Sequence, residues 1–146
     1  MSYIQFPIAA ALALLAFAAS AQPSDGASGD ELIRKGLQAL QQIDQGQAGA
    51  LWDGAPAFVK AAKPQAQFAD ELQQARATVG DVIRRDWASV VRIQYPEGSV
   101  SPPPGLYANV DYATRLANGG TVYEKLSFRL EPTGWRLTGY EPRRNQ

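Results

Sequence analysis

Two ionisable side chains occupy positions where the sequence pattern otherwise places apolar ones. Apolar residues alternate along the predicted strand Thr121–Leu130, and Glu124 stands at one of the positions on the apolar face. Arg85 has the equivalent phase in the predicted strand Val82–Tyr95. A charge in an apolar core is costly unless an opposite charge and hydrogen bonds neutralise it. We therefore expect Glu124 and Arg85 to contact each other.

Two further residues are candidates for the same site. Arg76, on the flank of a predicted helix, is a second potential partner for Glu124, and Tyr112 faces inward in the predicted strand Leu106–Leu116. One interpretation is a structural ion pair that fixes the sheet against the helix. Another is the polar floor of a ligand pocket, lined by Glu124, Arg85, Arg76 and Tyr112. The third is an acid–base site with Glu124 as the base and Tyr112 as the hydroxyl donor, which a nearby arginine opposes by stabilising the ionised carboxylate.

The composition of the chain excludes several kinds of site. The 146 residues include 14 basic and 14 acidic side chains, so no net positive field exists to hold a nucleic acid backbone. Cysteine and histidine are both absent. The chain therefore has no disulfide, thiol nucleophile or zinc thiolate site, and it lacks the usual general base near neutral pH. We predict no catalytic residue, no metal site and no cofactor.

Three amphipathic helices are predicted in the first half of the chain. They cover Asp30–Gln45, Gln47–Ala62 and Pro64–Gly80, where apolar residues recur at helical spacing. Pro56 lies inside the second segment and predicts a kink or break near Gly54, because its ring clashes with the preceding turn. The inward stripe predicted for the first helix is Ile33, Leu37, Leu40 and Ile43.

Four strands are predicted after the helices. Their ranges are Val82–Tyr95, Leu106–Leu116, Thr121–Leu130 and Trp135–Tyr140. The proline-rich segment Pro96–Gly105 predicts a stiff loop, and Glu131–Gly134 predicts a tight turn. In the first strand the apolar residues of the inward phase are Ile83, Trp87, Val91, Ile93 and Tyr95. The tyrosines assigned to the outer face of the sheet are Tyr107, Tyr123 and Tyr140.

Helices followed by a meander of strands indicate an α+β domain. We expect three N-terminal helices packed on one face of a curved four-stranded antiparallel sheet. A twisted sheet that wraps around helices forms a cup or cone, which is similar to the cystatin-like and nuclear-transport-factor-like architecture.

The N-terminal segment has the features of a secretory signal peptide. Phe6–Ala21 is largely apolar and ends in the small-x-small sequence Ala19-Ser20-Ala21. We predict cleavage after Ala21, which gives a periplasmic or secreted protein without membrane attachment. An uncleaved anchor is the alternative, but a membrane span needs about 20 apolar residues. The predicted organisation is a signal peptide (1–21), a flexible tether (22–29), one α+β domain (30–142) and a tail (143–146).

One ordered series of residues resembles a known family. The series consists of Asp44, Gly46, Trp52, Phe58, Arg76, Gly80, Arg85, Gly105, Tyr107, Glu124 and the segment Gly134–Tyr140. It resembles the small secreted bacterial proteins catalogued as the domain of unknown function DUF4019, over about Asp30–Pro142. The resemblance implies a secreted α+β domain, and it implies no particular activity.

These observations favour a secreted or periplasmic binding domain that performs no chemistry. Its partner would be a small apolar ligand or a protein. The alternative is a structural or assembly role, through homodimerisation on the outer face of the sheet, where tyrosines would suit an interface. The third hypothesis is a cup-type acid–base enzyme that uses Glu124.

Overall fold

The helices precede the strands along the chain, as expected. In the computed structural model, which describes residues 28–144, the elements are α1 (Gly29–Asp44), α2 (Ala48–Asp53), α3 (Ala57–Ala62), α4 (Gln65–Ala77), β1 (Val82–Tyr95), β2 (Gly105–Leu116), β3 (Thr121–Glu131) and β4 (Gly134–Arg144). The predicted signal peptide (1–21) and residues 22–27 of the predicted tether lie outside the described residues. No helix among the described residues combines the length and apolarity that a membrane span requires.

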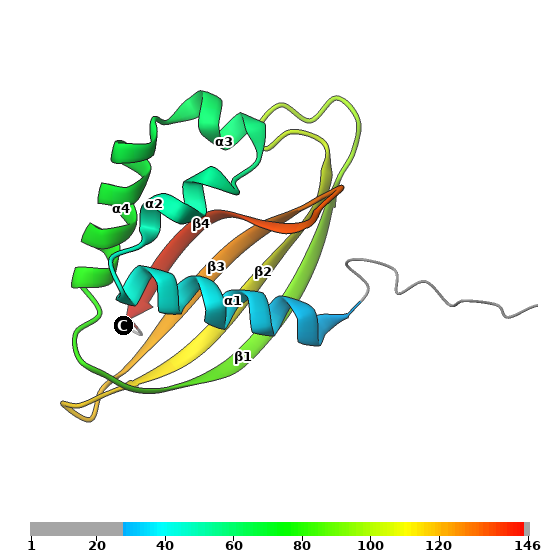
Figure 1. Cartoon of the computed structure of the whole chain (residues 1–146). Coiled ribbons are helices and arrows are strands. Elements are labelled where there is room, and N and C mark those ends of the chain that lie inside the picture. Colours follow the sequence, from blue (N-terminus) through cyan, green and yellow to red (C-terminus); the bar gives the residue numbers. More distant parts are fainter. Residues whose placement is uncertain (1–27, 145–146) are drawn as a thin grey trace, which may run out of the picture.

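The strands form one antiparallel sheet in the order β1-β2-β3-β4, so each strand pairs with its neighbour in sequence. α1 crosses the strands on one face of this sheet, and α4 lies alongside β4 (Figure 1). Gly134 follows the β3–β4 turn with a φ of 104°, a backbone conformation that glycine adopts without strain. The architecture confirms the predicted α+β class of helices packed on a four-stranded antiparallel sheet.

The predicted second helix is divided into two short helices. α2 ends at Asp53 and α3 begins at Ala57, so four helices stand where three were expected. Pro56 is the N-cap of α3, because its ring cannot continue the preceding helix. The break allows α3 to turn, and it brings the ring of Phe58 to 6.4 Å from the ring of Tyr107 on β2.

The buried face of α1 differs from the predicted stripe. Leu32, Leu40 and Ile43 are fully buried, but Leu37, which was expected to face inward, is 43% exposed. Gly36 lies on the buried face, where the ring of Tyr112 approaches the helix so closely that a side chain on Gly36 would overlap it. The contact between a glycine and a large ring therefore sets how α1 lies on the sheet.

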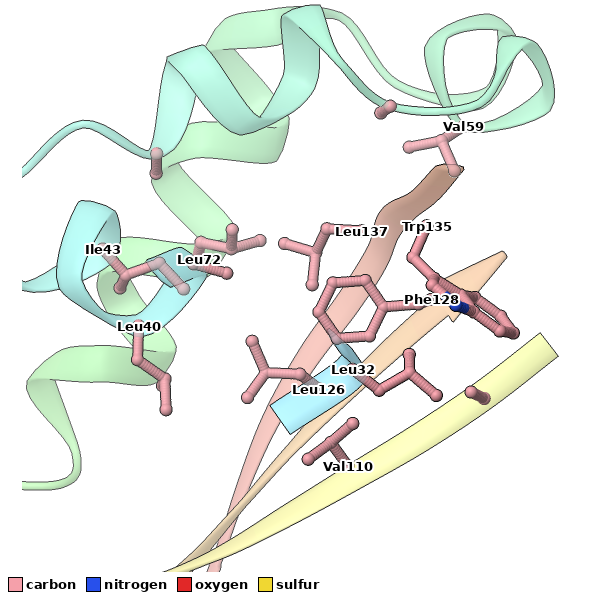
Figure 2. Packing of buried hydrophobic residues seen from close by; sticks show 14 of the residues in the cluster. Leu32, Leu40, Ile43, Val59, Leu72, Val110, Leu126, Phe128, Trp135 and Leu137 are labelled. Atoms are coloured by element: carbon pink, nitrogen blue, oxygen red, sulfur yellow. The ribbon is translucent and has the colours of Figure 1, made fainter. Parts of the chain in front are cut away.

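The core lies between the helices and the inner face of the sheet (Figure 2). Its large members are Leu32, Leu40, Ile43, Val59, Phe68, Leu72, Val110, Tyr112, Leu126, Phe128, Trp135 and Leu137. They come from α1, α3, α4 and the three strands β2, β3 and β4. A smaller cluster at the far end of the sheet contains Val79, Leu116 and Val122. β1 adds no fully buried residue to either cluster, although Val90 and Val82 are partly buried against them.

The predicted inward phase of β1 is only partly correct. The register of β1 against β2 shifts twice, between Val82 and Arg84 and again between Trp87 and Ser89. The second bulge places Val91 opposite Asn109, on the outer face of the sheet. Ile83, Trp87 and Val91, which were expected to be buried, are among the most exposed large apolar residues, with Trp87 at 60%.

A bulge in β4 also reverses part of the predicted pattern. Ser127 pairs with Gly139 and Phe128 with Leu137, which leaves Thr138 as an extra residue in β4. Tyr140 consequently points to the inner face, where its hydroxyl reaches Glu124, and it is wrong to group it with the outer tyrosines. Tyr107 is on the outer face but buried. The expected aromatic group for a dimer interface is therefore not assembled.

The C-terminal boundary also differs from the predicted one. β4 continues to Arg144, so Arg143 and Arg144 belong to the sheet and not to a tail. Arg143 pairs with Tyr123 of β3 in the register and forms an ion pair with Asp111 of β2. The guanidinium of Arg144 donates a hydrogen bond to the carbonyl oxygen of Thr78, after α4, at 2.9 Å.

The Gly36–Tyr112 contact makes a stability prediction. A Cβ on Gly36 would stand 2.2 Å from the Tyr112 hydroxyl oxygen and 2.9 Å from its ring. We expect Gly36→Ala to lower the free energy of unfolding by about 1–3 kcal/mol, because the ring has to move. Urea denaturation measures this change.

Gly49→Ala in α2 is the matched control. A Cβ there meets only the Gln65 side chain, at 3.4 Å. We expect this second substitution to be neutral, or to stabilise by roughly 0.5–1 kcal/mol through helix propensity. Equal destabilisation by the two substitutions would contradict the role assigned to Gly36.

Candidate functional site

Glu124 is 0% exposed, and both of its carboxylate oxygens accept hydrogen bonds. Arg85 donates from Nε to Oε1 at 2.7 Å, and the hydroxyl of Thr114 donates to the same oxygen. Tyr140 donates its phenolic hydrogen to Oε2 at 2.6 Å. The structure thus joins Glu124 and Arg85, as the phase of their strands predicted, and adds two hydroxyl donors.

Each strand of the sheet contributes one side chain to this cluster. Arg85 comes from β1, Thr114 from β2, Glu124 from β3 and Tyr140 from β4. Arg85 and Thr114 are opposite each other in the register, so their side chains leave the sheet on the same face. The cluster therefore spans the sheet from one edge to the other.

Asp44, at the C-terminal end of α1, extends the cluster to the helices. Arg85 donates to its carboxylate from Nη1 at 2.6 Å and from Nη2 at 3.1 Å. Arg76, near the end of α4, donates to Asp44 from Nε at 2.5 Å and to the carbonyl oxygen of Gly80 at 3.0 Å. Arg76 thus enters the network through Asp44 and not as the expected direct partner of Glu124.

The charges in the network cancel, since two arginines face two carboxylates. Burial alone would raise the pKa of Asp44, but the hydrogen bonds from Arg85 and Arg76 outweigh it and hold that pKa below its usual value. Burial opposes the charge of Arg85 in the same way, and its hydrogen bonds to Asp44 and Glu124 raise its pKa above the usual value. Burial, followed by the hydrogen bond to Glu124, raises the pKa of Tyr140.

Tyr112 does not take part in the network, although it is the residue opposite Glu124 in the β2–β3 register. Its hydroxyl donates to the carbonyl oxygen of Ile33 in α1. Glu124 and Tyr112 therefore do not converge on a common cavity, and the geometry gives the acid–base hypothesis no support. Among residues 28–144, no group of three Asp, Glu, His or Cys side chains gathers as a metal site requires.

A pocket lies beside the network, between α3, α4 and β4. It has a volume of about 290 Å³. Its lining residues are Phe58, Val59, Ala62, Lys63, Phe68, Glu71, Leu72, Thr138, Gly139 and Tyr140. Tyr140 joins the pocket to the network, because its ring forms part of the wall while its hydroxyl is held by Glu124. None of the four residues predicted to line a pocket, Glu124, Arg85, Arg76 and Tyr112, lines this one.

Sequence reasoning missed three members of the network. Thr114 was given no role, and Tyr140 was assigned to the outer face. Asp44 had a signal of its own: a carboxylate at the C-terminal end of a helix is opposed by the helix dipole, so it requires cationic partners. Two arginines provide them.

The network predicts a large effect of single substitutions at Glu124. Glu124→Leu leaves Arg85 with one carboxylate fewer and leaves the hydroxyls of Thr114 and Tyr140 without their acceptor. We expect the free energy of unfolding to fall by about 3–5 kcal/mol, measured by urea denaturation. Glu124→Gln should also lower the free energy of unfolding, because it keeps the shape of the side chain and removes its charge.

Two further variants make this measurement specific. Asp86→Asn breaks the exposed Arg84–Asp86 pair on β1, which should change stability by less than about 1 kcal/mol. Arg85→Met/Glu124→Leu should recover only part of the loss, because Arg85 also neutralises Asp44. If Glu124→Leu proved as stable as the wild type, the network would contribute nothing to stability.

The comparison with known proteins covers the whole of this network. A family model described as "Protein of unknown function (DUF4019)" matches residues 35–140, from within α1 to Tyr140. No curated protein matches the chain. Because the family match extends over well more than half of the 146 residues and includes every member of the network, the chain belongs to the DUF4019 family.

Proposed function

We propose that the mature chain is a periplasmic or secreted binding domain that takes a small apolar ligand in the pocket between α3, α4 and β4. The observation that carries this proposal is the unfilled volume of about 290 Å³ between aromatic and aliphatic side chains. Ligand pockets are typically about 300–1,000 Å³ and mainly apolar, with a few polar groups that orient the ligand. The volume therefore favours a compact ligand.

The polar groups of the pocket favour a ligand without net charge. Lys63 and Glu71 are the only charged residues of the lining, and they form an ion pair with each other. The hydroxyl hydrogen of Tyr140 is already donated to Glu124. Since neither charge is left unpaired, burial of apolar surface is the main gain that the pocket offers to a ligand.

The ion network supports this function by fixing two walls of the pocket. Phe68 and Leu72 line the pocket from α4, and Arg76 of the same helix is anchored to Asp44. Tyr140 lines it from β4 and is anchored to Glu124. A pocket whose walls are held in place loses less conformational entropy when a ligand binds.

Binding of a neutral apolar fluorophore tests this proposal. N-phenylnaphthylamine fluoresces strongly when it leaves water, and we expect saturable binding to the mature protein. Ala62 lines the pocket near the end of α3. Ala62→Phe should fill the pocket and weaken binding at least about tenfold, which corresponds to about 1.4 kcal/mol.

Ala61→Phe is the matched control, because Ala61 is exposed on the same helix and does not line the pocket. We expect this variant to bind the fluorophore as the wild type does. Equal affinity of the Ala62→Phe variant, or no saturable binding by the wild type, would overturn the proposal.

The proposed compartment has a separate test. When the full chain is produced in a bacterium with a periplasm, we expect the exported protein to begin at Gln22. N-terminal sequencing of the periplasmic fraction measures this. A protein that keeps Met1 and stays with the membranes would favour the anchor alternative instead.

A further inference from the structure

A second pocket, of about 190 Å³, lies apart from the apolar one. α1, α2 and the first residues of β4 surround it, and it shares no lining residue with the apolar pocket. Its wall is of a different kind. Lys35 and Gln38 from α1 and Arg136 from β4 contribute polar groups, while Leu51 and Leu137 contribute apolar surface.

The charged groups of this pocket are both cationic. Lys35 and Arg136 line it, and no acidic residue does. Within residues 28–144, Lys35 makes no hydrogen bond or ion pair. Arg136 donates from Nε and Nη2 to the hydroxyl of Thr133, at 3.3 and 3.0 Å, which leaves Nη1 beside Gly54. The pocket therefore offers two positive charges that no carboxylate of the described chain neutralises.

The indole of Trp135 adds an unused donor to the wall. Trp135 is 2% exposed and is one of the lining residues, and its buried Nε1 has no hydrogen-bond partner among the described residues. A buried N–H group without an acceptor costs free energy, so most such groups in proteins are satisfied. Trp52 provides the contrast within the same chain, because its Nε1 donates to the carbonyl oxygen of Lys63 at 2.8 Å.

We propose that this pocket binds a small monocarboxylate. The carboxylate would accept hydrogen bonds from Lys35, from Nη1 of Arg136 and, after a small shift of the wall, from the indole of Trp135. The short hydrocarbon part would lie against Leu51 and Leu137. A ligand of this pocket needs a negatively charged hydrogen-bond acceptor and an apolar tail. The pocket between α3, α4 and β4 favours a ligand without net charge.

The three tryptophans provide a direct measurement. In a ¹⁵N-labelled mature protein each indole N–H gives its own NMR resonance, and Trp52→Phe and Trp87→Phe assign two of the three. Titration with propanoate and hexanoate should move the Trp135 resonance in a saturable way. The resonances of Trp52, which is already bonded, and of the exposed Trp87 should not move. Propanamide, the neutral counterpart of propanoate, should have no effect.

Substitution of the two cations tests the same site without touching the core. We expect Lys35→Gln/Arg136→Gln to weaken carboxylate binding at least about tenfold, because it removes both charge-assisted donors. Arg34→Gln, an exposed neighbour on α1 that does not line the pocket, should change the affinity less than about twofold. The amide spectrum of each variant verifies that it is folded.

Several results would overturn the proposal. A Trp135 resonance that stays in place up to high carboxylate concentration would do so, as would equal binding by the double variant. Binding of inorganic phosphate in preference to the carboxylates would show that the ligand class is wrong. Equal binding of propanamide would show that charge plays no part. None of these results depends on binding of the neutral fluorophore, so the two proposals stand or fail separately.

Discussion

A carboxylate without exposed surface must be neutralised from inside the protein, and in this chain that carboxylate is Glu124. Arg85 supplies the opposite charge, but its guanidinium has more donors than one carboxylate uses. Asp44 takes the remaining donors and in turn binds Arg76. Negative and positive side chains thus alternate from the buried Glu124 to the ends of α1 and α4. The packing of these helices on the sheet depends on this chain of neutralisation as well as on the apolar core.

The two pockets that we propose as ligand sites differ in chemical character. The one beside the network is apolar, and its only charges are paired with each other. The other has two unpaired cations and an indole N–H without an acceptor. The break at Pro56 separates the two short helices that line them, since α2 lines the cationic pocket and α3 lines the apolar one. The interruption in the predicted second helix therefore gives each of the two short helices a different pocket to line.

Alternation along the strands was sufficient to predict the sheet, its connections and the meeting of Arg85 with Glu124. It failed where one strand holds a residue more than its neighbour, as at Thr138, which turns Tyr140 inward, and before Ser89, which turns Val91 outward. A bulge depends on the paired strand, so a pattern within one strand does not reveal it. The role of Asp44 was missed because it lies at the end of a helix, and periodicity does not show which side chains of other elements a helix end meets. The pockets arise from packing between helices, which periodicity does not describe.

The distribution of the network over all four strands has a consequence for how the sheet opens. Each strand contributes one residue to the cluster. Glu124 carries the carboxylate, and the hydrogen bonds to it come from Arg85, Thr114 and Tyr140. Detachment of any strand, including either edge, therefore leaves a charge or a hydroxyl without its partner in an apolar interior. Edge strands in many sheets fray independently at low cost. Here the shared carboxylate raises the free-energy cost of fraying at both edges, and we expect hydrogen exchange near the cluster to be slower in β1 and β4 than in edge strands without such a contact.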